Sequence, residues 1–225
     1  MVEMFNKNLQ AQIILLISLV FVSCDPVPKV GSVCDLPQEE INQNNSDIEP
    51  SRECSIPERE PSANLEMNIS LKDFNRDQES KMRKAIERLL IVINSKEFKT
   101  RVLDHQYNNE FAFANNNGQT NEEIYNTIMD GAESLNSEVD QEIDIDVTLY
   151  YKNNSTVGYT YPNTPNIWVN NKFFSTFSLG KVAANLTHEW THKLGYEHDF
   201  NSTTKRSFSV PYGVGKIMQE LVDSM

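Results

Sequence analysis

The sequence predicts an α+β domain from about Glu66 onward, in which helices pack on a β-sheet. Two observations predict this class. Strict alternation of apolar and polar residues is typical of half-buried strands, and its clearest case runs from Ile143 to Leu149. Apolar residues at every third or fourth position are typical of helices with one buried face, and the longest such stretch runs from Arg76 to Asn94. The predicted order is strand, helix, helix, three strands, helix and a short last helix.

The first half of this domain is predicted to contain one strand and two helices. Met67, Ile69 and Leu71 alternate with polar residues and predict the strand. A second helix is expected after Thr120, because Thr120 and Glu123 have the spacing of a capping box. The apolar stripe of this second helix contains Ile124, Ile128, Ala132 and Leu135.

The second half is predicted to contain three strands and two helices. Alternation predicts strands at Ile143–Leu149 and Val157–Tyr161, and a further extended run is expected at Ile167–Val169. A helix from Leu179 to Leu194 follows, with Ser178 as its N-cap. A short terminal helix is expected from Gly215 to Asp223.

Residues 1–23 have the pattern of an export signal. Lys7 precedes an apolar run from Ala11 to Val22, which is too short to cross a bilayer comfortably and has the length of a signal-peptide core. The run ends in Ser23-Cys24, which resembles a bacterial lipoprotein cleavage site. This resemblance implies that Cys24 carries a lipid and that the exported protein is anchored to a membrane of the bacterial cell envelope. Plain cleavage with secretion, or a short membrane anchor, are the alternatives.

Residues 24–65 are predicted to form a tether. Prolines are frequent in this segment and no apolar periodicity is sustained, so it cannot bury a core of its own. If Cys24 is lipidated, Cys34 and Cys54 remain, and in an exported protein such a pair is expected to form a disulfide. Residues 66–225 are then expected to form the folded domain.

One motif in this domain carries chemistry. Residues 188–198 read His-Glu-Trp-Thr-His-Lys-Leu-Gly-Tyr-Glu-His, which is the pattern H-E-x-x-H-x-x-G-x-x-H. The chain has four histidines, and three of them are His188, His192 and His198. The fourth, His105, has no evident partner and is expected at the surface. A chance occurrence of the full pattern has a probability on the order of one in 10⁵ for a chain of this length.

The spacing of the motif predicts a zinc site. Residues i and i+4 lie above one another on a helix, so His188 and His192 can direct ring nitrogens at one point. Gly195 can adopt positive φ, end the helix and let the chain return with His198 as third ligand. Three protein ligands leave a fourth position for water, which marks a catalytic Zn²⁺ site. Glu189 lies about 100° around the helix from His188 and is expected to be the general base. A purely structural zinc site is the alternative, but it would not need Glu189.

The long motif resembles that of the metzincin clan of zinc endopeptidases. The resemblance implies a twisted mixed sheet, an active-site helix with the first two histidines, and a short C-terminal subdomain. It also implies an edge strand that aligns a peptide substrate, and Asn166–Val169 is the expected strand, with Ile167 and Trp168 as substrate contacts. Both residues have an alternative role in the core.

Metzincins also have a turn below the metal, with a methionine followed by a tyrosine. The nearest match is Ser209-Val210-Pro211-Tyr212-Gly213, where Pro211 replaces the methionine. Tyr212 is a candidate catalytic residue by this resemblance, or else a packed turn residue. Asp199 is a reserve ligand, because some related zinc enzymes use aspartate as the third ligand.

The function expected from the motif is therefore a zinc metalloendopeptidase. Two other classes remain open: a zinc hydrolase of a non-protein amide such as a cell-wall component, and a non-catalytic lipoprotein with a degenerate protease domain. The formal net charge of −12, without a basic stripe, argues against a nucleic-acid partner. Neither the oligomeric state nor the substrate preference can be predicted from these residues.

Overall fold

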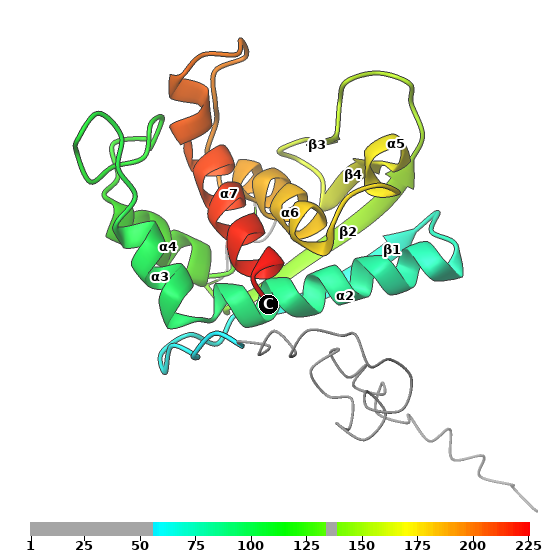
Figure 1. Ribbon diagram of the computed structural model, residues 1–225, viewed down its shortest axis with the longest axis horizontal. Helices are drawn as coiled ribbons and strands as arrows, with labels where there is room; N and C mark the ends of the chain where they lie inside the picture. The colour runs from blue at the N-terminus through cyan, green and yellow to red at the C-terminus, as the bar shows by residue number, and fades with distance from the viewer. Residues whose placement is uncertain (1–55, 134–138) are drawn as a thin grey trace, which may run out of the picture. The chain divides into compact units, whose positions relative to one another are not determined.

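In the computed structural model, which describes residues 56–133 and 139–225, four strands form one sheet in the order β1-β2-β4-β3 (Figure 1). Strand β2 (Glu142–Tyr150) lies between β1 (Glu66–Lys72) and β4 (Asn166–Asn170) and is parallel to both. Strand β3 (Gly158–Thr160) runs antiparallel to β4 and forms the edge of the sheet. The α+β class and the mixed sheet are confirmed.

The strand order corrects the prediction that Asn166–Val169 forms the edge of the sheet. Ile167 pairs with Val147 of β2 on one side and with Thr160 of β3 on the other. Both edges of β4 are therefore occupied, so no peptide can add to it as a further strand. Among the described residues, the two edge strands of the sheet are β1 and β3.

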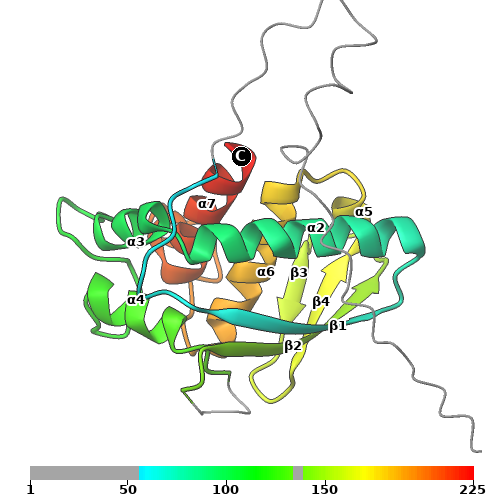
Figure 2. The same ribbon diagram turned by 90° about the horizontal axis from the view of Figure 1, so that it is seen from below.

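Helices cover one face of this sheet. In β2 the residues at 143, 145, 147 and 149 are buried, whereas those at alternate positions are exposed or half-buried. Helix α2 (Arg76–Ile93) lies along the buried face beside α6 (Leu179–Lys193), and α6 packs against α7 (Val210–Asp223) (Figure 2). Asn75 caps α2 with both hydrogen bonds of a capping box.

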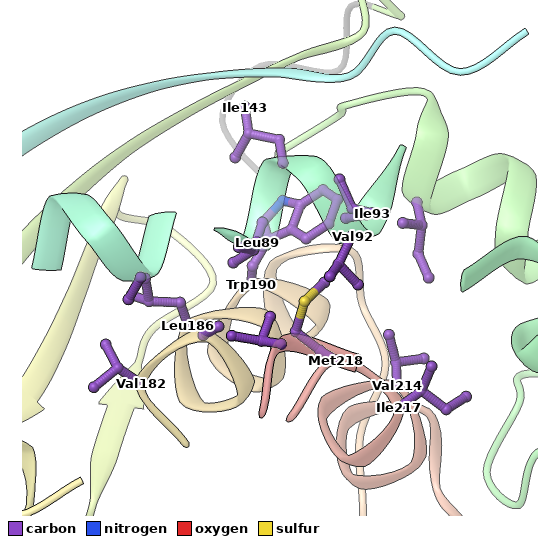
Figure 3. Close-up of a cluster of buried hydrophobic side chains, with 14 of the residues drawn as sticks. Leu89, Val92, Ile93, Ile143, Val182, Leu186, Trp190, Val214, Ile217 and Met218 are labelled. Atoms are coloured by element: carbon purple, nitrogen blue, oxygen red, sulfur yellow. The ribbon is translucent and has the colours of Figure 1, made fainter. Parts of the chain in front are cut away.

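The core forms where these three helices and β2 meet. Trp190 of α6 is 1% exposed, and the close-up in Figure 3 shows it among side chains of α2, α7 and β2. Met218 of α7 is fully buried in the same cluster. Because burial of side chains of this size stabilises each helix by several kcal/mol, α6 is held as a rigid element beneath the site described below.

Four helices differ from the sequence prediction. Helix α7 begins at Val210, five residues before the expected Gly215, so Ser209–Gly213 is a helix start and not a turn. Pro211 fits there, because a proline in the first turn lacks only a donor that would be unpaired anyway. Helix α4 (Asn121–Met129) has the expected capping box at Thr120 but ends before Ala132. Helices α3 (Lys96–Leu103) and α5 (Asn171–Phe174) were not predicted.

The folded part of the chain begins before Glu66. Ala63 and Leu65 are buried, and Lys96 donates its backbone N–H to the carbonyl of Glu58. Residues 56–65 therefore pack on the domain. The export signal, Cys24 and the Cys34–Cys54 pair lie outside the described residues, as does Leu135. None of the described helices is long and apolar enough to cross a membrane.

Candidate metal centre

Helix α6 places two histidines side by side on its polar face. Ser178 caps the helix by accepting a hydrogen bond from the backbone N–H of Lys181 at 3.2 Å. The opposite face is buried, through Val182, Ala183, Leu186 and Trp190. The rings of His188 and His192 lie with their centroids 5.0 Å apart.

The end of α6 turns the chain back toward these rings. Gly195 has φ +89°, and its N–H donates to the carbonyl of His192 at 3.1 Å. The N–H of Tyr196 donates to the carbonyl of Thr191 at 3.2 Å. These two bonds form a Schellman cap, in which the left-handed residue is nearly always glycine. The predicted positive φ at Gly195 is confirmed.

Tyr196 anchors the returning segment. Its side chain is 1% exposed, and its hydroxyl donates to Gln119 at 2.7 Å. Asn117 donates its side-chain amide to the carbonyl of Gly195 at 3.0 Å. The loop before α4 therefore holds the segment that carries His198, and sequence reasoning did not identify these supports.

The three histidines converge. His188, His192 and His198 each offer a ring nitrogen, and these nitrogens lie within 4.8 Å of one another. No other cluster of this kind occurs among residues 56–133 and 139–225. The expected ligand set is thus brought together and could hold a metal ion.

Each of the three rings also contacts a backbone carbonyl. His192 Nδ1 donates to the carbonyl of Tyr196 at 2.7 Å, and His198 Nδ1 donates to that of Asp199 at 3.1 Å. His188 has a hydrogen bond with the backbone of Pro211. Such bonds fix the tautomer and leave Nε2 of His192 and His198 free for a metal. The backbone of Pro211, the residue that stands where the sequence resemblance led us to expect methionine, therefore orients the ring of His188.

Burial favours the neutral imidazoles of His188 and His192, and the neutral imidazole is the form that binds a metal. Desolvation, followed by the nearby rings of His192 and His198, lowers the pKa of His188 to about 3. Desolvation also lowers the pKa of His192, against a hydrogen bond from its ring to Tyr196. Imidazoles with one oriented nitrogen each fit a zinc ion, for which nitrogen is a preferred ligand atom.

Glu189 is a buried carboxylate beside this cluster. Its side chain is 5% exposed, and Asn185 donates its side-chain amide to it at 3.4 Å. Desolvation raises the pKa of Glu189 to about 8, although Asn185 and Lys193 oppose that shift. A dication near the carboxylate would favour its ionised form.

Asn185 lies directly under the edge strand. A Cβ atom on Gly158 of β3 would lie 2.8 Å from Asn185 Oδ1 and 2.9 Å from Nδ2, so the Asn185 amide would have to move to admit a side chain there. The missing side chain of Gly158 therefore lets β3 approach α6 beside Glu189. Sequence reasoning missed both residues, and a glycine within a predicted strand is the signal that could have indicated this close approach.

Lys193 is a buried cation that the sequence did not single out. It is 3% exposed, and its ammonium group donates to the carbonyl of Thr164 in the loop between β3 and β4. Desolvation lowers its pKa to about 8, while the carboxylates of Glu133 and Glu189 act in the opposite direction. The contact with Thr164 ties the end of α6 to the loop that follows the edge strand.

Tyr212 lies against the histidines. Its ring centroid is 4.6 Å from that of His188 and 4.9 Å from that of His198. Arg206 donates to its hydroxyl oxygen. The first turn of α7 therefore brings Tyr212 to the cluster, as the sequence resemblance implied.

The other candidates lie elsewhere. Asp199 is not in the metal-ligand cluster, and its oxygens accept hydrogen bonds from Asn115 and Thr203. Ile167 is fully buried in the core, and Trp168 stacks on Tyr159 with ring centroids 5.0 Å apart. Neither lines the cavity at the metal centre. The expected substrate contacts are thus corrected, because β4 is an inner strand.

The position of His105 differs from the expectation that it lies at the surface. It is half-buried and stacks on Phe113 with centroids 3.9 Å apart, and burial lowers its pKa. It packs in the interior next to α7 and is remote in sequence from the motif. It takes no part in the ligand cluster.

A cavity of about 790 Å³ opens above the cluster. The three histidines and Glu189 line it, together with β3 and the start of α7. The lining residues are Ser155, Thr156, Val157, Gly158, Tyr159, Thr160, Pro162, Ala184, Asn185, His188, Glu189, His192, Glu197, His198, Phe200, Arg206, Pro211, Tyr212, Gly215, Lys216 and Gln219. The space is large enough to receive several residues of a peptide.

Comparisons of the chain with protein-family models, with curated proteins and with solved structures found no match.

Proposed function

We propose that the protein is a zinc-dependent metallopeptidase. One observation carries this proposal: three histidine nitrogens converge within 4.8 Å in an open cavity, with the buried carboxylate of Glu189 beside them. Three imidazoles are a ligand set of catalytic zinc and leave one coordination position open. A structural zinc site would need neither the cavity nor the carboxylate.

A zinc ion at this site would act as a Lewis acid, which acidifies a water and polarises the scissile carbonyl. Glu189 takes the proton of the attacking water and returns it to the leaving nitrogen. Tyr212 donates its hydroxyl proton in a hydrogen bond to the oxygen that becomes negative in the transition state. Asn185 keeps the Glu189 side chain in place through its amide.

An extended peptide is the substrate that the cavity walls favour. Strand β3 pairs with β4 on one side. Its residues Gly158–Thr160 line the same cavity as the three histidines. The unpaired edge of such a strand offers backbone donors and acceptors to an added strand. We infer that β3, and not β4, aligns the peptide.

The two alternatives make different demands on the same cavity. A zinc hydrolase of a non-protein amide would use the same metal and base but would not need the strand edge. A degenerate, non-catalytic domain would not need a buried Glu189, which costs folding free energy when it ionises. Export and lipidation at Cys24 remain part of the proposal, and the mass of the mature N-terminus tests them.

The experiment is a digest of a peptide library by the zinc-loaded chain from Asp25 onward, which contains every described residue. Cleavage that Glu189→Gln abolishes and Glu122→Gln leaves intact would support the proposal. Glu122 is a matched control because it is an exposed carboxylate on α4. Cleavage of peptidoglycan fragments but of no peptide would favour the non-protein amide instead. Zinc binding without any hydrolysis would contradict both enzymatic readings.

A further inference from the structure

Arg206 is held in a fixed position on the wall of the metal cavity. Its Nη1 donates to the carbonyl of Phe200 at 3.0 Å, and its Nη2 donates to the hydroxyl of Tyr212. The guanidinium carbon lies 4.9 Å from the centroid of the Tyr212 ring. These contacts immobilise a side chain that otherwise has considerable rotamer freedom.

No carboxylate neutralises this guanidinium within the described part of the chain. Arg83 and Arg101 form ion pairs with Glu79 and Glu220, whereas Arg206 has no acidic partner within ion-pair distance. Its Nε is buried and has no hydrogen-bond partner. The chain carries 32 acidic and 20 basic residues, so a fixed and unpaired cation in its cavity is unexpected without a ligand.

We propose that Arg206 is a specificity-determining residue that binds a substrate carboxylate, namely an aspartate or glutamate side chain next to the scissile bond. The inference rests on the proposed peptidase function and deepens it. Arg206 packs on Tyr212, whose ring is 4.6 Å from that of His188, so the cation lies one side chain away from the metal ligands.

The unused donors of Arg206 suit this role. Each terminal nitrogen of a guanidinium carries two N–H groups, and one on each is already used by Phe200 or Tyr212. The two that remain can donate to the oxygens of a carboxylate. Because the guanidinium is already fixed, little further entropy is lost when a carboxylate binds.

A second cation in the cavity wall is less suited than Arg206 to bind a substrate carboxylate. Lys216 also lines the cavity, but its side chain is 74% exposed and lies 3.7 Å from the carboxylate of Glu220. An exposed and already paired ammonium contributes little to recognition. The preference is therefore assigned to Arg206.

The test is a comparison of two peptides that differ only in Glu or Gln beside the cleaved bond. The zinc-loaded chain from Asp25 onward should cleave the Glu peptide with kcat/KM roughly tenfold or more above that of the Gln peptide. Arg206→Gln should bring this ratio to within about twofold of one. Lys205→Gln removes the same charge from an exposed neighbour that does not line the cavity, and it should retain the ratio.

The ratio of kcat/KM for the Glu and Gln peptides distinguishes recognition of the substrate carboxylate by Arg206 from positioning of Tyr212. Loss of the contact to Tyr212 would slow both peptides equally and leave the ratio unchanged, which would overturn the proposal. Equal cleavage of both peptides by the unaltered chain would also overturn it while leaving the peptidase function in place. If neither peptide is cleaved, the peptidase function fails, and calorimetric Kd values of the two peptides then decide the role of Arg206. A Kd ratio near one would refute that role.

Discussion

Glu189 should destabilise the metal-free protein as the pH rises, and its replacement by glutamine should remove that effect. Burial raises the pKa of this carboxylate from 4.5 to about 8, against the smaller influences of Asn185 and Lys193. Because the folded-state pKa lies above the unfolded value, the group favours folding below pH 4.5, and that contribution is lost as the pH rises to 8.

The magnitude follows from the two pKa values. One pKa unit corresponds to about 1.36 kcal/mol, so ionisation costs the folded state about 3 kcal/mol at pH 7 and about 5 kcal/mol at pH 9. Near pH 5 the cost is under about 1 kcal/mol. Glutamine has nearly the same shape and does not titrate. The unfolding free energy of Glu189→Gln minus that of the unaltered protein should therefore increase by about 4 kcal/mol from pH 5 to pH 9.

Urea unfolding of both metal-free proteins at pH 5, 7 and 9 measures this difference. Histidine titration is common to both proteins and cancels in the comparison. A difference in unfolding free energy that does not change with pH would refute the reasoning, because it would mean that the carboxylate is not desolvated. A gain that appears only in the absence of zinc would show that the site, once loaded, stabilises the ionised form.

Three further predictions concern the same centre. Tyr212→Phe should lower kcat roughly 100-fold while zinc content and KM change little, because one donor to the developing negative oxygen is lost; an unchanged kcat would exclude that role. Gly158→Ala should cost about 1–3 kcal/mol of stability in urea unfolding, because its Cβ would lie 2.8 Å from the Asn185 side chain, and it should also slow hydrolysis; a neutral variant would show that β3 does not press on Asn185. Removal of zinc by a chelator should lower the melting temperature by about 5–10 °C, since ligand at 100 times its Kd contributes about 2.7 kcal/mol, and an unshifted transition would argue against a metal at this site.

The sequence predicted those parts of the fold whose information is local. Helices α2 and α6 came within a residue of their observed ends, because each has a side-chain cap and a repeated apolar face. The strand at 142–150 was predicted equally well, since one of its faces is buried and the other is half-buried or exposed. These signals depend only on residues within one element.

Strand order is not local, and the prediction failed there. Asn166–Val169 has the apolar residues of a strand, and nothing in this segment shows that β3 pairs on its far side. Position in the sheet depends on which strands are brought together in space. The assignment of substrate contacts to Ile167 and Trp168 was wrong for the same reason, because it depended on β4 being an edge strand.

The start of α7 was misjudged for a local reason. Ser209-Val210-Pro211 has the residues of a turn, but serine at an N-cap and proline in a first turn also begin helices. The convergence of the three histidines, in contrast, was predicted correctly, because the spacing of His188 and His192 on one helix and the glycine after it fix the geometry. The supports of the centre, Tyr196 and Gln119, come from separate segments and were not visible in the sequence.

The most direct test of the metal centre is the zinc content of the purified chain after equilibration with zinc and removal of the excess. The unaltered protein should contain one zinc ion per chain, His198→Ala should contain almost none, and His105→Ala should retain it, because His105 lies outside the ligand cluster. Equal zinc in all three proteins, or no zinc in any, would contradict the centre built from His188, His192 and His198.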